Sequence, residues 1–196
     1  MTELVIVRHG RTQSNTRYAY CGWTDVELDE EGISQARSAR DRMRSLKVDY
    51  IFSSPLKRAL KTAEIINENF NLPITCSESL KERNFGVWED LQYEEICEKF
   101  PEQVKMLEKD WMKYCIQNGE SALQFYSRVV EFVDGLLSDK QGTFLIVTHL
   151  GCIRNTVSHL LGMGIEGSWR FRVDNCGITR IQINDEGYAY LTQLNG

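Results

Sequence analysis

The chain has 196 residues, of which 42% are hydrophobic and 26% are charged. This length and composition predict one globular domain, residues 1–196, with enough apolar side chains to bury a substantial core. The net charge of −5 gives no sign of the basic surface that is typical of nucleic-acid binding, so we expect no nucleic-acid partner. A phosphorylated small molecule can still bind where cationic side chains gather, because local charge decides such binding.

The sequence predicts a cytoplasmic protein without a membrane partner. No segment approaches the length of a membrane span, and the apolar run over residues 1–7 lacks the basic flank and cleavage site of a signal peptide. The six cysteines form no C-x-x-C pair, which indicates reduced thiols and no metal site. The sequence predicts no bound cofactor and leaves open whether the chain forms a homodimer.

The first predicted elements are two strands with a helix between them. The aliphatic run over residues 4–7 predicts a strand that is buried on both faces. Asp29 is the expected N-cap of a helix that carries an apolar stripe over residues 33–46. Residues 50–52 predict a second short strand, which is again buried.

A longer helical stretch follows the second strand. Ser54 and Pro55 predict the cap and the first residue of the next helix. Residues 91–137 are mostly helical in pattern, and Ser121 with Gln124 resembles a capping box that opens the last helix of this stretch.

The C-terminal third predicts a strand, a helix and a hairpin. Residues 144–147 form a third aliphatic strand, and a helix is expected over residues 151–161. Residues 178–183 alternate with a period of two, residues 184–187 predict a turn, and residues 188–194 return as the hairpin partner.

Strands that alternate with helices predict an α/β fold. We expect a three-layer αβα architecture, in which helices cover both faces of a mostly parallel central sheet, with a C-terminal hairpin. The long helical stretch between the second and third strands predicts a helical cap insertion at about residues 88–140.

Polar residues follow each of the three clear strands. Arg8 and His9 follow the first strand, Arg58 lies one turn into the helix after the second, and His149 follows the third. Because ligands of open α/β sheets bind beyond the carboxyl ends of the strands, we expect these side chains to meet. Arginine offers phosphate oxygens a planar fork of donors and keeps its charge. The cluster therefore predicts a phosphoryl-binding site, to which Asn15 and backbone donors would contribute.

Two histidines, His9 and His149, reach this site, and histidine is a side chain that can attack phosphorus. A histidine attacks phosphorus only in its neutral form. Adjacent guanidinium groups lower a histidine pKa from its ordinary value of about 6.5, which favours that form. A histidine flanked by Arg8 and Arg58 is therefore suited to the attack.

Residues 8–15, Arg-His-Gly-Arg-Thr-Gln-Ser-Asn, resemble the R-H-G-x-T-x-x-N signature of the histidine phosphatase superfamily, the relatives of cofactor-dependent phosphoglycerate mutase. Five further segments resemble the remaining motifs in the family's order. They are a pocket loop at 21–25, a second arginine motif at 53–59, an acid motif at 80–89, a short segment at 119–121 and a second histidine motif at 147–154. The matches cover most of the chain, which makes the set specific.

This resemblance implies a metal-independent phosphomonoesterase that works through a phosphohistidine at His9. It implies that Glu82 protonates the departing alkoxide and later activates water. It further implies that the phosphoryl oxygens are held by Arg8, Asn15, Arg58 and His149, and that phosphate or substrate binding also involves Thr12, Gly22, Trp23, Leu150 and Gly151.

The expected substrate is a small phosphorylated metabolite. The chain length and residues 22–25 most resemble the α-ribazole-5′-phosphate phosphatases of cobalamin assembly. One alternative is a phosphoglycerate mutase-type phosphotransferase, although residues 105–118 lack the arginines and prolines that retain a second phosphate in those enzymes. Another is a non-catalytic module that binds phosphorylated ligands, which predicts a damaged nucleophile or acid, whereas both His9 and Glu82 are present.

Aromatic residues gather in the predicted cap. They either form a ring-binding surface or pack as core, and we expect core; they are Trp88, Tyr93, Trp111 and Tyr114. Residues 162–167 fit G-x-G-x-x-G by count, but they follow a helix instead of opening one, so they predict a turn and not a dinucleotide site.

Overall fold

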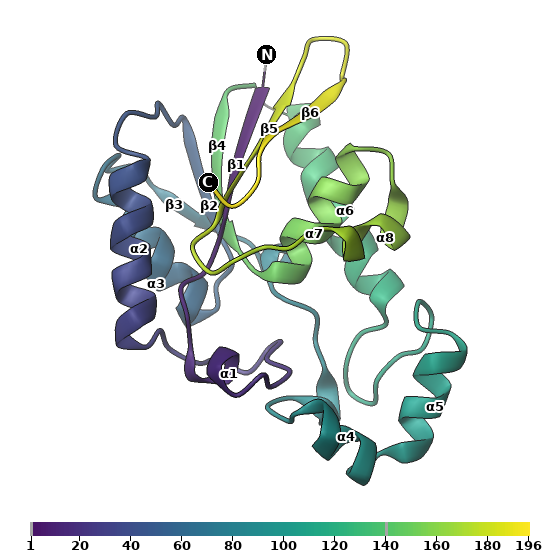
Figure 1. Ribbon diagram of the computed structural model, residues 1–196. Coiled ribbons are helices and arrows are strands. Elements are labelled where there is room, and N and C mark those ends of the chain that lie inside the picture. Colours follow the sequence, from purple (N-terminus) through teal and green to yellow (C-terminus); the bar gives the residue numbers. More distant parts are fainter. Residues whose placement is uncertain (1, 140) are drawn as a thin grey trace.

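The computed structural model describes residues 2–139 and 141–196, and its centre is a six-stranded sheet with helices on both faces (Figure 1). The strands are β1 (Thr2–Arg8), β2 (Tyr50–Ser53), β3 (Ile74–Cys76), β4 (Thr143–Thr148), β5 (Ile178–Ile183) and β6 (Ala189–Gln193). Their order across the sheet is β3-β2-β4-β1-β5-β6. The first four strands pair in parallel, and β5 and β6 add an antiparallel hairpin at one edge. The predicted α/β fold is confirmed.

The helices are α1 (Gln13–Thr16), α2 (Glu30–Arg42), α3 (Lys57–Asn67), α4 (Tyr93–Lys99), α5 (Pro101–Lys109), α6 (Ala122–Asp139), α7 (Leu150–Leu160) and α8 (Gly164–Gly167), with 3₁₀ helices η1 (Glu78–Leu80), η2 (Gly86–Trp88) and η3 (Ser168–Arg170). Within the described residues, none of these helices is both long enough and apolar enough to span a bilayer.

Side chains of β1 alternate between two cores, one on each face of the sheet. Leu4 and Ile6 pack in the core that α6 and α7 cover, whereas Val5 and Val7 pack in the core that α2 and α3 cover (Figure 1). Successive side chains of a strand point to opposite faces, so a strand buried on both faces is continuously aliphatic. The continuous aliphatic run of residues 4–7 therefore reflects burial on both faces of the sheet, as predicted.

Two predicted caps are present. The Asp29 side chain accepts a hydrogen bond of 2.7 Å from the N–H of Gly32 at the start of α2. At the start of α6, the N–H of Ser121 donates to Oε1 of Gln124 at 2.9 Å, and the N–H of Gln124 donates to Oγ of Ser121 at 3.1 Å. Each bond satisfies a backbone donor that the first helical turn leaves without a partner.

The predicted start of α3 was wrong by two residues, and one strand was missed. The helix begins at Lys57 with Leu56 as its N-cap. The Ser54 hydroxyl accepts from the N–H of Leu56 at 3.3 Å, so it supports the turn before the helix instead of capping it. The missed strand, β3, has three residues, of which Thr75 and Cys76 are exposed, so it lacks the apolar run that reveals a buried strand.

Residues 86–120, here called the cap segment, pack around a core of their own. The buried side chains of that core are Trp88, Ile96, Val104 and Ile116. Its helices α4 and α5 lie beyond the end of the sheet (Figure 1). Helix α6 instead contributes Val129 and Val133 to a core on the sheet. The insertion predicted at about 88–140 thus includes a helix that covers the sheet.

Candidate active site

The carboxyl ends of β1, β2 and β4 bring the predicted residues to one edge of the sheet (Figure 1). Arg8 ends β1, and His149 follows β4 as the N-cap of α7. Arg58 lies in the first turn of α3, which follows β2. The rings of His9 and His149 have centroids 5.1 Å apart. Residues distant in sequence thus meet at one place.

A cavity of about 480 Å³ opens at this edge, and we call it the phosphoryl cavity. The predicted residues that line it are Arg8, His9, Asn15, Glu82 and Leu150. Arg58 and His149 are almost fully buried and belong to the surrounding layer. Within residues 2–139 and 141–196, no three histidine, cysteine, aspartate or glutamate side chains gather in a way that suits a metal ion.

His9 is held as a neutral ring with a defined proton. It is 5% exposed, and its Nδ1 lies 2.7 Å from the carbonyl oxygen of Gly10. Because a carbonyl oxygen only accepts, Nδ1 carries the proton and Nε2 keeps its lone pair. Burial, followed by the charges of Arg58 and Arg8, holds the pKa of His9 well below its ordinary value, against the opposing effect of the bond to Gly10. The lone pair of Nε2 is therefore unprotonated at neutral pH.

Asn15 is oriented by a small polar network. Its Oδ1 accepts from the N–H of Thr12 at 3.1 Å, from the Thr12 hydroxyl at 3.2 Å and from Nδ2 of Asn175 at 3.3 Å. Nδ2 of Asn175 also donates to the carbonyl of His9 at 2.9 Å. With Oδ1 occupied, the amide N–H groups of Asn15 are the part that suits a phosphate oxygen. Thr12 is fully buried and caps α1, so it orients Asn15.

Arg58 holds the loop 21–24 by its carbonyl groups. Nη1 donates to the carbonyl of Thr24 at 2.8 Å, and Nη2 donates to that of Gly22 at 2.6 Å. Nε of Arg58 is buried and has no hydrogen-bond partner in the described part of the chain. A desolvated N–H on a cation favours an anionic acceptor, so Nε is the donor that suits a phosphoryl oxygen.

Glu89 holds the same loop by its N–H groups. Its carboxylate accepts from the N–H of Gly22 at 3.0 Å, of Trp23 at 2.8 Å and of Thr24 at 3.1 Å. The loop is thus fixed between a guanidinium and a carboxylate. Trp23 continues the connection, because its Nε1 donates to the carbonyl of Glu82 at 3.0 Å. Gly22 and Trp23 therefore lie in a loop whose position is fixed from both sides.

Glu82 is oriented by two backbone donors. Oε2 accepts from the N–H of Gly151 at 3.0 Å, and Oε1 accepts from the N–H of Arg83 at 2.9 Å. Gly151 is the second residue of α7, so the carboxyl group lies at the positive end of that helix. A Cβ on Gly151 would lie 2.4 Å from Oε1, which only glycine avoids at this approach.

His149 is fully buried beside His9. Its Nε2 lies 2.8 Å from the Ser54 hydroxyl, and its Nδ1 has no partner in the described residues. Burial, then the positive charge of Arg58, lowers the pKa of His149 well below its ordinary value. The ring is therefore neutral and can act as a hydrogen-bonding group without adding charge.

Arg8 supplies the second cation. Its Nη1 donates to the carbonyl of Val173 at 2.7 Å, and its Nε is buried without a partner in the part of the chain described. Burial lowers the pKa of Arg8, but a guanidinium begins from so high a value that it stays charged. The phosphoryl cavity is thus lined or flanked by two desolvated cations, Arg8 and Arg58.

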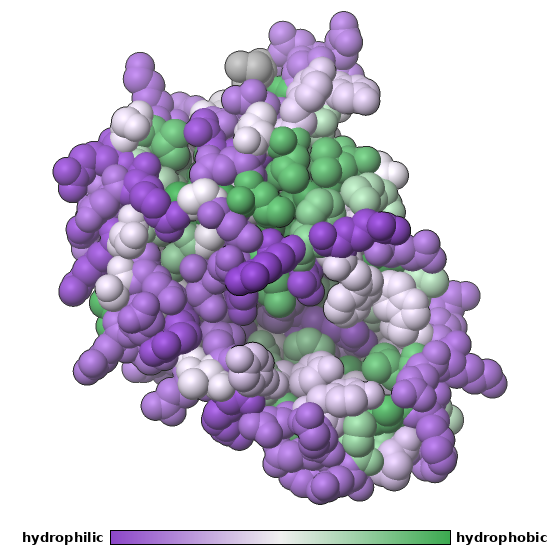
Figure 2. Space-filling view, in the orientation of Figure 1, coloured by the Kyte–Doolittle hydropathy of each residue, from purple (hydrophilic) through white to green (hydrophobic). Residues whose placement is uncertain are grey.

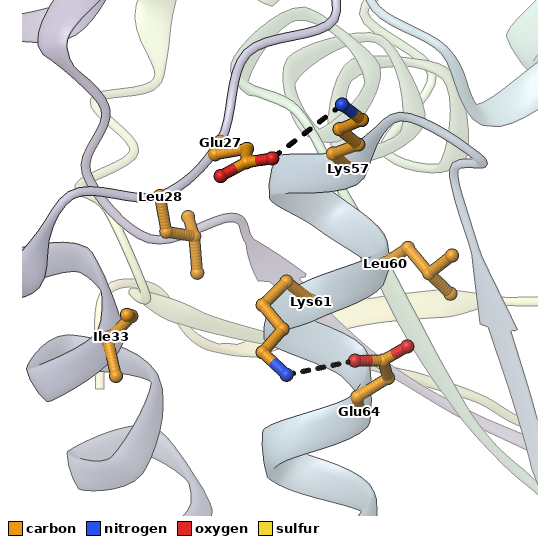
Figure 3. Close-up of a pocket in the computed structure, with 7 residues that line it drawn as sticks. All are labelled: Glu27, Leu28, Ile33, Lys57, Leu60, Lys61 and Glu64. Atoms are coloured by element: carbon orange, nitrogen blue, oxygen red, sulfur yellow. Dashed lines mark hydrogen bonds and ion pairs between the residues drawn. The ribbon is translucent and has the colours of Figure 1, made fainter.

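A separate hollow between the starts of α2 and α3 lacks this chemistry. Its lining residues are Glu27, Leu28, Ile33, Lys57, Leu60, Lys61 and Glu64 (Figure 3). Lys57 pairs with Glu27 at 3.6 Å, and Lys61 pairs with Glu64 at 3.2 Å. Both cations are therefore compensated, and none of the predicted site residues lies there.

Comparisons with known proteins agree with this geometry. The family model described as the histidine phosphatase superfamily (branch 1) matches residues 4–195. The chain is 32% identical over 194 residues to the adenosylcobalamin/alpha-ribazole phosphatase of Escherichia coli strain K12, covering 98% of this chain and 95% of that protein. It is 31% identical over 186 residues to phosphoserine phosphatase 1 of Hydrogenobacter thermophilus, covering 94% and 88%. The crystal structure of the alpha-ribazole phosphatase from Shigella flexneri matches with a TM-score of 0.94 and 31% identity, covering 100% of this chain and 96% of that one.

An α/β sheet that presents paired histidines and arginines at the carboxyl ends of its strands defines an enzyme that handles phosphoryl groups. With the matches above, the assignment becomes specific: the chain belongs to the histidine phosphatase superfamily. The family that the sequence motifs resembled is confirmed.

Proposed function

We propose that the chain is a metal-independent phosphomonoesterase that hydrolyses a small phosphorylated metabolite through a phosphohistidine at His9. The observation that carries this proposal is the buried, neutral ring of His9, whose proton is fixed on Nδ1 by Gly10. Membership of the superfamily, and relatives named as phosphatases, support hydrolysis.

The phosphoryl group binds in the phosphoryl cavity by charge and hydrogen bonds. Arg8 and Nε of Arg58 offer cationic donors, and Asn15 offers its amide N–H groups. His149 contributes a neutral ring beside His9. Fixed donors stabilise the charge that develops on the oxygens in the transition state, and they need no reorganisation during the reaction.

The chemistry takes two displacements. In the first, Nε2 of His9 attacks phosphorus, an N–P bond forms, and the P–O bond to the alcohol breaks as Glu82 gives its proton to the departing oxygen. In the second, Glu82 takes a proton from water as the water oxygen attacks phosphorus. The N–P bond breaks, inorganic phosphate leaves, and both side chains return to their starting states.

The substrate that we propose to test first is α-ribazole-5′-phosphate, because relatives named for it share about a third of the residues over nearly the whole chain. A panel should contain this compound, phosphoserine and 3-phosphoglycerate, with phosphate release as the readout. We expect kcat/KM of about 10⁴ M⁻¹ s⁻¹ or more for the natural substrate class, unchanged by EDTA.

Three results would refute all or part of the proposal. Isomerisation of 3-phosphoglycerate primed with 2,3-bisphosphoglycerate, faster than phosphate release, would indicate a mutase. Tight vanadate binding without turnover of any phosphomonoester would indicate a binding module. Strong inhibition by EDTA would replace the metal-independent mechanism with a metal-dependent one.

A further inference from the structure

A second cavity, of about 290 Å³, adjoins the phosphoryl cavity. The residues that line both are Tyr20, Glu82, Phe85 and Leu150. The two spaces are therefore neighbours around the Glu82 carboxyl group. Figure 2 shows the surface hollowed between the sheet-bearing body and the part of the molecule that contains α4 and α5.

The walls of the second cavity are mainly aromatic and aliphatic. The cap segment contributes Trp88, Leu107 and Trp111, and the body contributes Phe125 and Trp169. Trp111 and Trp169 approach each other edge to face, with ring centroids 5.9 Å apart and planes at 73°. Trp169 is 63% exposed, which is unusual for so large an apolar side chain. Such walls bind an apolar ring by burial and by ring contacts.

Three polar side chains of these walls are donors only, and they are Arg83, Trp88 and Arg154. Nη2 of Arg83 and Nε1 of Trp88 are buried without partners in the described residues. The Arg83 guanidinium is anchored through Nε, which donates to the carbonyl of Glu120 at 3.0 Å. Arg154 also lines the cavity, with its guanidinium carbon 5.9 Å from the Trp169 ring centroid. Among the described residues, Glu82 is the one carboxyl group that lines this cavity, so the cavity favours a ligand that brings acceptors.

The position of Glu82 assigns the two cavities to the two halves of a substrate. A group that protonates the departing oxygen must lie within hydrogen-bond reach of that oxygen. The phosphoryl group then lies on the side of His9, and the alcohol extends to the other side, into the second cavity.

We propose that the second cavity is the leaving-group site, and that it selects phosphomonoesters of alcohols that carry an apolar ring with a hydrogen-bond acceptor on its edge. This inference rests on the proposed function, since it needs Glu82 at the departing oxygen. Small polar alcohols leave the aromatic walls uncovered and the donors of Arg83 and Trp88 without acceptors.

The first test compares two substrates that differ only in the ring, 2-phenylethyl phosphate and ethyl phosphate. We expect kcat/KM for the phenyl compound to exceed that for ethyl phosphate by about 10- to 100-fold, as expected for burial of one ring. Trp111→Ala should lower this ratio by about tenfold. Tyr93→Ala is the matched control, because Tyr93 is an exposed aromatic residue of the cap segment that does not line the cavity. In this variant, the ratio of kcat/KM for the phenyl compound to that for ethyl phosphate should equal the wild-type ratio.

The second test addresses the acceptor. A carboxylate at the para position of the phenyl ring should raise kcat/KM further, by about fivefold or more, because it meets Arg83. Arg83→Met should remove this gain while keeping the preference for the unsubstituted ring over ethyl phosphate. Arg83→Lys should restore part of the gain, since it restores the charge.

Equal kcat/KM for the ring-bearing and ring-free substrates would overturn the inference, as would a Trp111→Ala variant that loses activity equally on both. Absence of turnover on every phosphomonoester would instead count against the proposed function. The cavity is then judged by binding to the His9→Ala variant, measured by tryptophan fluorescence. Tighter binding of 2-phenylethyl phosphate than of ethyl phosphate supports the leaving-group site, and equal binding refutes it.

Discussion

Replacement of His9 by alanine is expected to lower kcat by about 10⁴-fold or more, with the folded structure retained. The reason is that no other described side chain combines a neutral imidazole, a fixed Nδ1 proton and a place in the lining of the phosphoryl cavity. Removal of a nucleophile leaves only the catalysis that binding and charge stabilisation provide. The measurement is steady-state phosphate release, with circular dichroism as the check on folding.

His159→Ala is the matched control for this variant. His159 lies on α7, its Nε2 pairs with Asp134 at 2.8 Å, and it does not line the phosphoryl cavity. Its kcat should stay within about twofold of wild type, as surface substitutions away from a site usually do. A His9→Ala enzyme that retains a tenth of wild-type kcat would remove His9 from the mechanism.

The Glu82→Gln substitution is expected to slow hydrolysis most for substrates whose leaving group must be protonated to depart. Glutamine has the shape of glutamate and can still accept from the N–H of Gly151, but it has no proton to give. The loss of a general acid lowers kcat by about 10²- to 10⁴-fold for alkyl phosphates. For p-nitrophenyl phosphate, the rate of the first displacement should fall less than about tenfold, because that leaving group departs as a stable phenolate.

The control for this prediction is Glu78→Gln. Glu78 lies in η1, shortly before Glu82 in the chain, and pairs with Lys81 at 2.6 Å, outside the phosphoryl cavity. The Glu78→Gln variant should hydrolyse alkyl phosphates and p-nitrophenyl phosphate as fast as the wild type does. Equal losses on alkyl and aryl phosphates in Glu82→Gln would assign Glu82 a role in binding or positioning and not in proton transfer.

The sequence predicted most strands of the sheet, and the convergence of Arg8, His9, Arg58 and His149 at one edge of it, because these signals are local. A strand buried on both faces is aliphatic throughout, as in residues 4–7, and the carboxyl ends of parallel strands must meet at one edge. Arg8 and His9 therefore had a predicted location as soon as the strand was recognised. The caps of α2 and α6 were equally visible, since each is a pattern of four neighbouring residues.

The contacts that orient the site were not visible in the same way. Asn175 reaches the carbonyl of His9 across 166 positions of sequence, and no local pattern marks that pairing. Glu89 stood inside a segment that matched the family's acid motif, which was the one available signal for its part in holding the loop 21–24. The resemblance implied that Arg58 holds phosphoryl oxygens, but it did not reveal that both terminal nitrogens of Arg58 donate to carbonyl groups of the loop 21–24.

The aromatic residues of the cap segment show a similar limit. Trp88 was expected to be core, and it is 2% exposed within a buried cluster. Trp111 belongs to the wall of the second cavity and meets Trp169, which lies 58 positions further along the chain. Composition and periodicity predict that aromatic side chains are buried, but only the tertiary arrangement separates a core from a ring-binding wall.

The most direct test of the phosphohistidine mechanism is to quench the enzyme during turnover of a ³²P-labelled phosphomonoester and to locate the label. We expect acid-labile, base-stable radioactivity on the protein, carried by the peptide that contains His9 and absent from the His9→Ala variant. Full turnover without any protein-bound label, or label on another residue, would contradict this mechanism.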